Sequence, residues 1–281
     1  MIGIGAFGRQ HTSARAPRVS TCRSISVSIL IVAAHPDDEI IGMGVFLSQV
    51  RRASVIVHVT DGAPRTGGDA HAAGCETWRE YAALRHREFE RALAFARISP
   101  AATLSLRCPD QQAAWRIADH AKCLAELLDR VPRPIVFTHP YEGGHPDHDA
   151  TAAAVHAAAC LSRRRPKLFE FAAYHAGAGG MECERFLGDI GEIPFTAERP
   201  LTAEESRWKR GVLNQFESQK RVLAQFPLAR EPLRLAPQYD FSRPPHSGRL
   251  YYEHFDWGPD GREWCALARG AFARLGASCV C

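Results

Sequence analysis

The sequence predicts an α/β fold with a doubly wound, mostly parallel sheet, helices on both faces of the sheet, and a C-terminal extension. Two observations support this prediction. Short β-branched apolar segments of strand length recur along the chain, and each is followed by a segment with apolar residues at helical spacing. Strands that alternate with helices in this way form parallel sheets. The chain of 281 residues is long enough to bury the core of one large domain.

The alternating pattern runs to about residue 180 and predicts the strand order 3-2-1-4-5. In a sheet of this order the first and fourth strands are neighbours at the topological switch point, where sites form at the carboxyl ends of strands. The expected strands are residues 25–34, 54–59, 103–107, 134–138 and 168–174, and the expected helices are residues 39–50, 76–96, 110–130 and 147–163.

The two ends of the chain differ from this pattern. Residues 1–24 contain four arginines and no acidic residue, and we expect them to form a flexible leader before a single domain over residues 25–281. Within that domain, residues 25–226 form the α/β core, which ends in a helix over 204–225. We expect residues 227–281 to form loops and a hairpin, built from the aromatic stretch Leu250 to Trp257, that wall the functional site.

Composition excludes several classes of protein. The net charge of +4 is too small to predict nucleic acid binding. No apolar run reaches the roughly 18 residues that a membrane span needs, so none is expected. The nine cysteines contain no Cys-x-x-Cys pair, and their scatter is typical of reduced, mostly buried thiols in a cytoplasmic protein. Nothing in the sequence indicates an oligomeric state.

Two short segments contain most of the candidate catalytic residues. The first, His35-Pro36-Asp37-Asp38-Glu39, follows the first strand, and the second, His145-Pro146-Asp147-His148-Asp149, follows the fourth. We call them the first and second His-Pro-Asp corners. Each is expected to open a helix, with proline in the first helical turn, where its missing N–H costs nothing. Because their strands are neighbours in the expected sheet, the corners should face each other across one crevice.

The corners contain a ligand set that suits catalytic zinc, with a fourth position open for water. The expected ligands are His35, Asp38 and His148. Asp37 must point away from its neighbour Asp38, and a carboxylate beside a zinc-bound water is placed to act as a general base. We expect His145 to face the oxyanion of the substrate and Asp147 to orient an imidazole. The sequence thus predicts a zinc-dependent hydrolase.

At these residues the sequence resembles the PIG-L/LmbE-like de-N-acetylases, whose two signatures look like the two corners. Residues 140–144 (Pro-Tyr-Glu-Gly-Gly), 60–62 (Thr-Asp-Gly), Arg85-x-x-Glu88 and Ser218-Gln219 fit the same family. The resemblance covers about residues 25–226. It implies a Rossmann-like fold, a mononuclear zinc site, and hydrolysis of N-acyl groups, most often from amino sugars. It also implies the same roles for the corner residues as those given above.

The resemblance further implies how the substrate is held. Arg85 is expected to point into the crevice and bind a substrate hydroxyl, while an ion pair with Glu88 on the helix surface is the alternative. Asp61 either contacts the substrate or shapes its own turn, and Tyr141 is expected to line the pocket. The expected substrate is a small N-acylated molecule, best an N-acetylglucosamine derivative that loses its acetyl group, because aromatic and polar side chains suit a neutral hydroxylated ligand.

Other functions would use the same site differently. A zinc amidase would act on a non-sugar N-acyl amine or on a thiol conjugate such as a cysteine conjugate. A nucleotide-binding protein would need a glycine fingerprint directly after the first strand, but Gly42 and Gly44 lie inside the expected helix. A non-catalytic zinc-binding module predicts that no activity is lost when Asp37, which is not an expected ligand, is changed.

Overall fold

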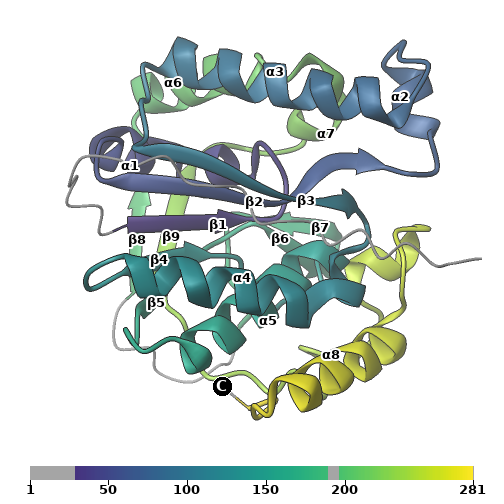
Figure 1. Cartoon of the computed structure of the whole chain (residues 1–281). Helices are drawn as coiled ribbons and strands as arrows, with labels where there is room; N and C mark the ends of the chain where they lie inside the picture. The colour runs from purple at the N-terminus through teal and green to yellow at the C-terminus, as the bar shows by residue number, and fades with distance from the viewer. Residues whose placement is uncertain (1–28, 189–195, 281) are drawn as a thin grey trace, which may run out of the picture.

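The computed structural model of the chain describes residues 29–188 and 196–280, so the predicted leader lies outside the described residues. The strands in these residues are β1 (Ile29–Ala33), β2 (Ser54–Pro64), β3 (Ala102–Asp110), β4 (Ile135–Thr138), β5 (Lys167–Phe171), β6 (Tyr174–Gly177), β7 (Gly180–Cys183), β8 (Thr196–Pro200) and β9 (Arg230–Leu235). Seven of them form one sheet of order β3-β2-β1-β4-β5-β9-β8 (Figure 1). The predicted order 3-2-1-4-5 is therefore confirmed.

The first five strands run parallel, and at the β5 edge β9 pairs antiparallel with β5 and β8 pairs antiparallel with β9. Strand β1 lies between β2 and β4, with Ile29 opposite Ser54 on one side and Ile135 on the other. Parallel neighbours end at the same edge of the sheet, so the segments that follow β1 and β4 begin side by side. This is where the two His-Pro-Asp corners lie.

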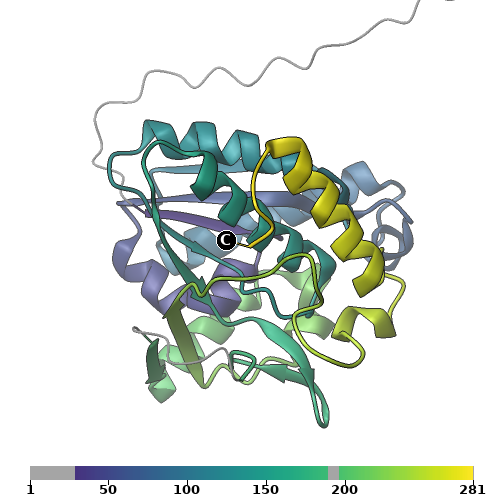
Figure 2. The ribbon, with the colours of Figure 1, turned by 90° about the horizontal axis from the view of Figure 1, so that it is seen from below.

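Helices cover both faces of the sheet (Figure 1). The α-helices are α1 (Asp38–Val50), α2 (Gly68–Ala72), α3 (Trp78–Ala96), α4 (Ile117–Arg130), α5 (Pro146–Leu161), α6 (Ala203–Leu213), α7 (Lys220–Leu223) and α8 (Gly261–Leu275), and the 3-10 helices are η1 (Ala113–Arg116), η2 (Glu217–Gln219) and η3 (Tyr251–His254). Helices α1, α3 and α6 pack on one face, and α4, α5 and α8 on the other. Figure 2 shows α8 from below, where it contacts α4 and α5.

Alternate side chains of β1 enter the two cores. Leu30 and Val32 pack with α4, α5 and α8, whereas Ile31 and Ala33 pack with α1 and α3. A strand that is buried on both faces needs apolar residues at every position. This explains why the first strand is recognisable in the sequence as a continuous apolar run.

Helix α1 is interrupted at Met43, whose φ of −151° and ψ of 27° are not helical. The residue before it, Gly42, lies against β5, and a Cβ added there would come within 2.2 Å of the Phe171 ring. Only glycine allows the helix to lie this close to the sheet. The two glycines that weaken the helix pattern in the sequence therefore mark a real break in the helix.

A buried ion pair from the C-terminal part of the chain binds the main chain of α1 just after this break. The N–H groups of Val45 and Phe46 donate to the carboxylate of Glu231 on β9, at 2.8 and 3.1 Å. Lys209 of α6 is fully buried and donates to the same carboxylate at 2.8 Å. A carboxylate with these partners has its hydrogen-bonding capacity met despite its burial.

The prediction of one helix over residues 204–225 is wrong in part. The segment forms α6, η2 and α7 in succession. The chain changes direction because Ser218 donates from both its main-chain N–H and its hydroxyl to Glu88 of α3, at 2.8 and 2.6 Å. These tertiary hydrogen bonds replace the helical ones that local propensity favours.

The prediction of a hairpin near residues 250–257 is also wrong. The aromatic stretch forms η3, because Glu253 accepts from the N–H of Leu250 at 3.0 Å and from that of Gly261 at 2.8 Å and so coils the segment. Helix α8 and strands β8 and β9 were not predicted. Among the described residues, no helix combines the length and apolar character that crossing a membrane requires.

Candidate metal centre and active site

The first His-Pro-Asp corner turns the chain from β1 into α1. The helix begins at Asp38, and Asp37 before it has a φ of 148°, which lies in the region that favours glycine. The main-chain N–H of His35 donates to Asp38 Oδ2 at 2.8 Å, and His35 Nδ1 lies 3.1 Å from the same oxygen. The side chains of His35, Asp37 and Asp38 are all buried. The corner is therefore a rigid turn that holds two adjacent carboxylates in different directions.

The second corner leads from the loop after β4 into α5. Pro146 is the first helical residue, as predicted. The side chain of His145 caps the helix, because its Nδ1 accepts the N–H of Asp147 at 3.1 Å. His148 follows one position later in the same turn. Both imidazoles thus project from a helix start whose backbone is unstrained.

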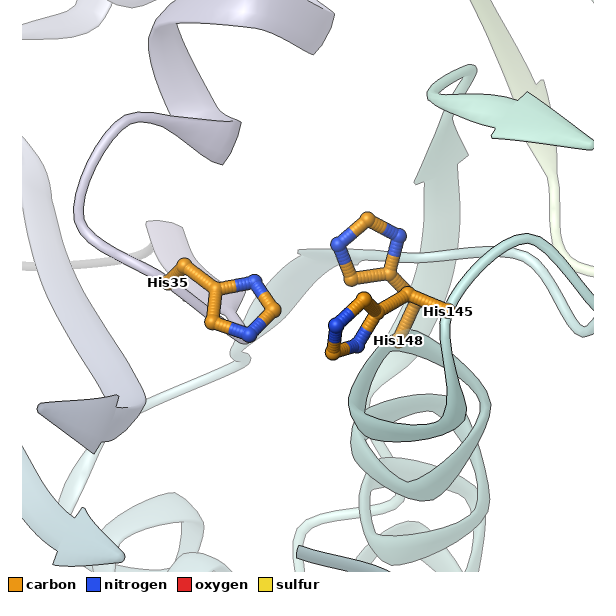
Figure 3. Close-up of side chains that lie close together, drawn as sticks. All are labelled: His35, His145 and His148. Atoms are coloured by element: carbon orange, nitrogen blue, oxygen red, sulfur yellow. The ribbon is translucent and has the colours of Figure 1, made fainter. Parts of the chain in front are cut away.

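The two corners meet across the crevice, as the strand order predicts. His148 Nε2 lies 3.3 Å from Asp38 Oδ1. The ring centroid of His35 is 4.7 Å from that of His145 and 5.3 Å from that of His148. In Figure 3, His35 comes from the loop after β1 and faces the two histidines at the start of α5. The structure therefore brings the expected ligands His35, Asp38 and His148 together with His145.

The donor atoms of this region suit a metal ion. Three groups have ligand atoms that lie within 4.8 Å of one another, and they share members: His35, His145 and His148; Asp38, His139 and His148; and His35, Asp110 and Asp147. Imidazole nitrogens and carboxylate oxygens are ligands that zinc prefers, and a set with two imidazoles and one carboxylate leaves a coordination position open. The residues present therefore fit a zinc ion.

Two members of these groups were not predicted as site residues. His139 follows β4, and its Nε2 accepts the N–H of Ala34 at 3.0 Å and lies 3.3 Å from Asp38. Its ring stacks on that of His148 with centroids 4.0 Å apart. Asp110 ends β3, and its carboxylate lies 3.0 Å from His35 Nε2. Both lie at the carboxyl ends of parallel strands, at the same edge of the sheet as the corners, which is the signal that would have found them.

The cluster is strongly coupled electrostatically. Burial alone would lower the pKa of His35, but the carboxylates of Asp110 and Asp38 raise it well above its usual value. Burial would likewise raise the pKa of Asp38, but the surrounding imidazoles, that of His148 foremost, hold it well below its usual range. Burial lowers the pKa of His139 to about 3, so this imidazole is neutral. The carboxylate of Asp38 is thus charged and available to a cation.

Asp37 faces a different partner. Its Oδ2 accepts from Arg85 Nη2 at 3.1 Å, and the same nitrogen donates to the carbonyl of Pro36 at 3.1 Å. Burial raises the pKa of Asp37 to about 7, against the opposing positive charge of Arg85. Arg85 is itself buried, and its Nε and Nη1 have no hydrogen-bond partner among the described residues. A carboxyl with a pKa near neutrality beside a metal cluster can accept and return a proton.

The other expected site residues lie in three different environments. Asp147 is buried beside the cluster, accepts the N–H groups of Gln111 and Ala113, and lies 3.5 Å from His35 Nε2. Asp61 lies in β2 and binds Arg65, which directly follows that strand, at 2.6 Å. The hydroxyl of Tyr141 donates to a main-chain carbonyl at 2.8 Å, and its ring is buried among aromatic side chains. The structure therefore brings Asp147 to the site, but not the side chains of Asp61 and Tyr141.

Aromatic residues outside the corners reach the cluster. The ring of Trp257, from the C-terminal extension, lies 4.9 Å from that of His145. On the other side, the ring of Tyr174 on β6 lies 5.2 Å from that of His148. The extension therefore contributes to the wall of the site, although it does so without the expected hairpin.

Comparisons with known proteins agree with this architecture. Residues 30–159, which contain both corners, match the sequence model of the PIG-L family, described as GlcNAc-PI de-N-acetylase. No curated protein shows a significant match to the sequence.

Solved structures with similar folds include three deacetylases. The zinc-inhibited form of teicoplanin deacetylase Orf2 has a TM-score of 0.56 and 15% identity, over 74% of this chain and 97% of that chain. A deacetylase of teicoplanin biosynthesis, in its bog complex, has a TM-score of 0.57 and 16% identity, over 74% and 96%. The A40926 pseudoaglycone deacetylase Dbv21 has a TM-score of 0.56 and 17% identity, over 75% and 97%.

At these identities the structural likeness shows the fold, while the family match depends on the sequence itself. It spans β1 to α5 and thus the part of the chain from which both corners project. Residues 30–159 therefore match the PIG-L family, the family that the two His-Pro-Asp corners resemble.

Proposed function

We propose that the protein is a zinc-dependent hydrolase that removes an acyl group, most readily acetyl, from the nitrogen of a small N-acetylglucosamine-type molecule. The observation that carries this proposal is the placement of Asp37. Its carboxyl is buried beside the cluster of histidines and carboxylates, yet it points to Arg85 and not to the other candidate ligands. The family match and the three deacetylases with this fold support the same reaction class.

In this proposal His35, Asp38 and His148 hold the zinc ion. A zinc ion bound there would polarise the amide carbonyl and lower the pKa of water. Asp37 takes a proton from the water that attacks the carbonyl carbon. The same proton then passes to the leaving nitrogen when the C–N bond breaks, so that the products are a free amine and a carboxylic acid, which ionises by losing its own proton to solvent. Arg85 holds Asp37 in the orientation that both transfers need.

His145 has the hydrogen-bond geometry of a neutral donor. Its Nδ1 accepts a main-chain N–H from Asp147, so the ring proton of the neutral imidazole resides on Nε2. We propose that this N–H donates to the oxyanion that forms on the carbonyl oxygen. Because the cap at the start of α5 places the ring proton on Nε2, this donation needs no positive charge on His145.

The test is to measure acetate release from a panel of N-acetylglucosaminides and from non-sugar N-acetyl amines, together with the zinc content of the protein. We expect the sugars to be cleaved and the Asp37→Asn variant to keep its zinc while losing activity. Cleavage of only the non-sugar amides would reject the sugar as the substrate and support the alternative of a zinc amidase. Unchanged activity in Asp37→Asn would reject the assigned base, and no cleavage of any amide would leave a zinc-binding module.

A further inference from the structure

A cavity of about 610 Å³ opens beside the cluster and plays no part in the mechanism above. Two of its lining residues touch the cluster directly. The carboxylate of Asp110 lies 3.0 Å from His35 Nε2, and the N–H of Gln111 donates to Asp147 at 2.6 Å. The cavity therefore adjoins His35, a proposed zinc ligand, and a substrate larger than one sugar could extend into it.

The wall of this cavity includes an exposed aromatic ring. Trp115 of η1 is 49% exposed, although side chains of this size are usually mostly buried. One edge of the ring rests near Gly258, where an added Cβ would lie 3.5 Å from Trp115 Cη2. Gly258 follows Trp257, the residue that contacts His145. The C-terminal loop thus supports the ring of Trp115 and joins it to the catalytic site.

The charges that line the cavity indicate a neutral ligand. Arg65 lines it too, but its guanidinium binds Asp61 at 2.6 Å and stacks over Trp78 at 3.6 Å. The carboxylate of Asp110 is paired with His35. The charged side chains that remain in the lining are Arg116 and Asp256, which are opposite in sign. Such a lining offers donors and acceptors but no net charge to select an anion or a cation.

A second cavity, of about 900 Å³, lies between α2, α3 and α7 and is a weaker candidate. Its aromatic residue, Tyr81, is buried and accepts a hydrogen bond from Gln219 at 2.7 Å. Ser218 in the same wall is bound by Glu88. The aromatic ring of this second cavity is covered, and these polar groups already have partners. The smaller cavity is therefore better suited to bind a ring of a ligand.

We propose that the cavity beside Asp110 is a subsite for a second ring of the substrate and that Trp115 determines specificity by stacking on this ring. The inference rests on the proposed deacetylation for the first ring. A sugar or an aryl group attached to the N-acylated sugar presents a face that packs on indole. Gln112, Arg116 and Asp256 then bind polar groups at the ring edge.

The experiment uses the zinc-loaded full-length protein and three substrates. Methyl N-acetylglucosaminide has no second ring, phenyl N-acetylglucosaminide has an aryl ring, and N,N'-diacetylchitobiose has a second sugar. We expect the wild-type protein to prefer at least one ring-bearing substrate over the methyl glycoside. For that substrate, Trp115→Ala should lower kcat/KM by about 5- to 10-fold, mainly through KM, because ring stacking is worth about 1 kcal/mol.

Three comparisons separate stacking from a general effect. Trp115→Ala should leave the methyl glycoside unchanged, and Trp115→Phe should restore most of the preference. Phe95→Ala is the matched control, since Phe95 is equally exposed, at 52%, but lies on α3 beside Gly211. A wild-type protein without preference for a second ring, or an equal loss on all three substrates, would overturn the inference.

The two proposals can also fail separately. If no sugar releases acetate, the proposed function is wrong, and binding of the phenyl glycoside is then measured by calorimetry. Binding that weakens about 5- to 10-fold in Trp115→Ala still supports the subsite. Absence of binding, or binding unaffected by the substitution, would reject the subsite as well.

Discussion

The two His-Pro-Asp corners share their first three residues, but their helices begin at different points. In the second corner Pro146 is the first residue of α5, and Asp147 lies inside the helix. In the first corner Pro36 and Asp37 both precede α1, which begins at Asp38. A shift of two residues in the helix start therefore gives the third residue of the same motif a different backbone and different partners.

The difference assigns the two aspartates to different roles. Asp147 accepts two main-chain N–H groups and braces the end of β3 against the cluster. Asp37 has a φ of 148° and binds the guanidinium of Arg85. Strained residues persist where the surroundings over-determine them, and they often mark functional sites. In the proposed mechanism Asp147 thus supports the site, and Asp37 is the reactive carboxylate.

The largest expected effect tests whether both corners hold the metal. We expect Asp38→Ala and His148→Ala to lose bound zinc, measured by mass spectrometry of the purified protein, because a site of three ligands rarely survives the loss of one. His86→Ala is the control, since His86 is exposed on α3. Full zinc occupancy in His148→Ala would show that the second corner supplies no ligand.

The next effect compares the aspartates at matched positions. Asp37→Asn should keep its zinc and lose a factor on the order of 10² or more in kcat, as expected for a general base. Asp147→Asn should lose less activity but destabilise the fold by about 1–3 kcal/mol, because its amide group cannot accept both main-chain N–H groups. Steady-state kinetics measures the loss of kcat, and urea unfolding measures the loss of stability. Equal losses of kcat would mean that Asp37 has no special role.

A smaller effect is the difference in stability between the glycine and alanine variants of each aspartate, which should have opposite signs in the two corners. Alanine and glycine both remove the carboxylate, so a comparison between them isolates the backbone. At position 37, glycine should be the more stable by about 1 kcal/mol, because it relieves the positive φ of Asp37. At position 147, inside α5, alanine should be the more stable by about 0.5–1 kcal/mol. The same order at both positions in thermal unfolding would show that Asp37 is not strained.

The last effect is negligible at neutral pH and appears only on acidification, and it concerns a histidine outside both corners. Burial, assisted by the charge of Arg116, lowers the pKa of His120 to about 4, whereas the carboxylates of the cluster raise that of His35. Between pH 6.5 and 4 the unfolded chain binds a proton at His120 that the folded protein does not. The free energy of unfolding should therefore fall as pH drops through this window, by up to about 1.4 kcal/mol per unit.

Replacing His120 by leucine should remove that part of the pH dependence and leave the dependence above pH 6.5 unchanged. Unfolding in urea at several pH values, with wild type and His120→Leu compared at each, measures the difference. Curves that stay parallel from pH 7 to pH 4 would show that His120 is not buried as a neutral group.

The parallel half of the fold was predictable because burial on both faces leaves a direct trace in the sequence. The run that ends at Ala34 marks the end of the first strand, and Pro146 marks the start of α5, without any tertiary information. The expectation that Pro36 also lies in the first helical turn is wrong, because α1 begins two residues later at Asp38. Asp110 and His139 carry no such local trace. Asp110 resembles a helix cap, and His139 is one histidine before a proline, so their roles depend on which strands lie side by side.

The antiparallel edge was not predictable for a related reason. Strand β9 has the sequence Arg-Glu-Pro-Leu-Arg-Leu, whose charges and proline argue against a buried strand. Glu231 and Arg234 are buried there because Lys209, Glu142 and Glu170 compensate them from other elements. Helix α8 did leave a signal, since Asp260 caps the N–H of Glu263, but the aromatic stretch before it favoured a hairpin.

The carboxylate that supports the break in α1 has a consequence for the synthesis of the protein. Val45 and Phe46 leave the ribosome long before Glu231, their hydrogen-bond partner 186 and 185 residues further along the chain. The main chain of α1 can therefore form these hydrogen bonds only after most of the chain has been synthesised. A nascent chain that stops after residue 159 would contain every candidate metal ligand and still lack this support, so a premature stop should yield a protein that aggregates and not a smaller enzyme.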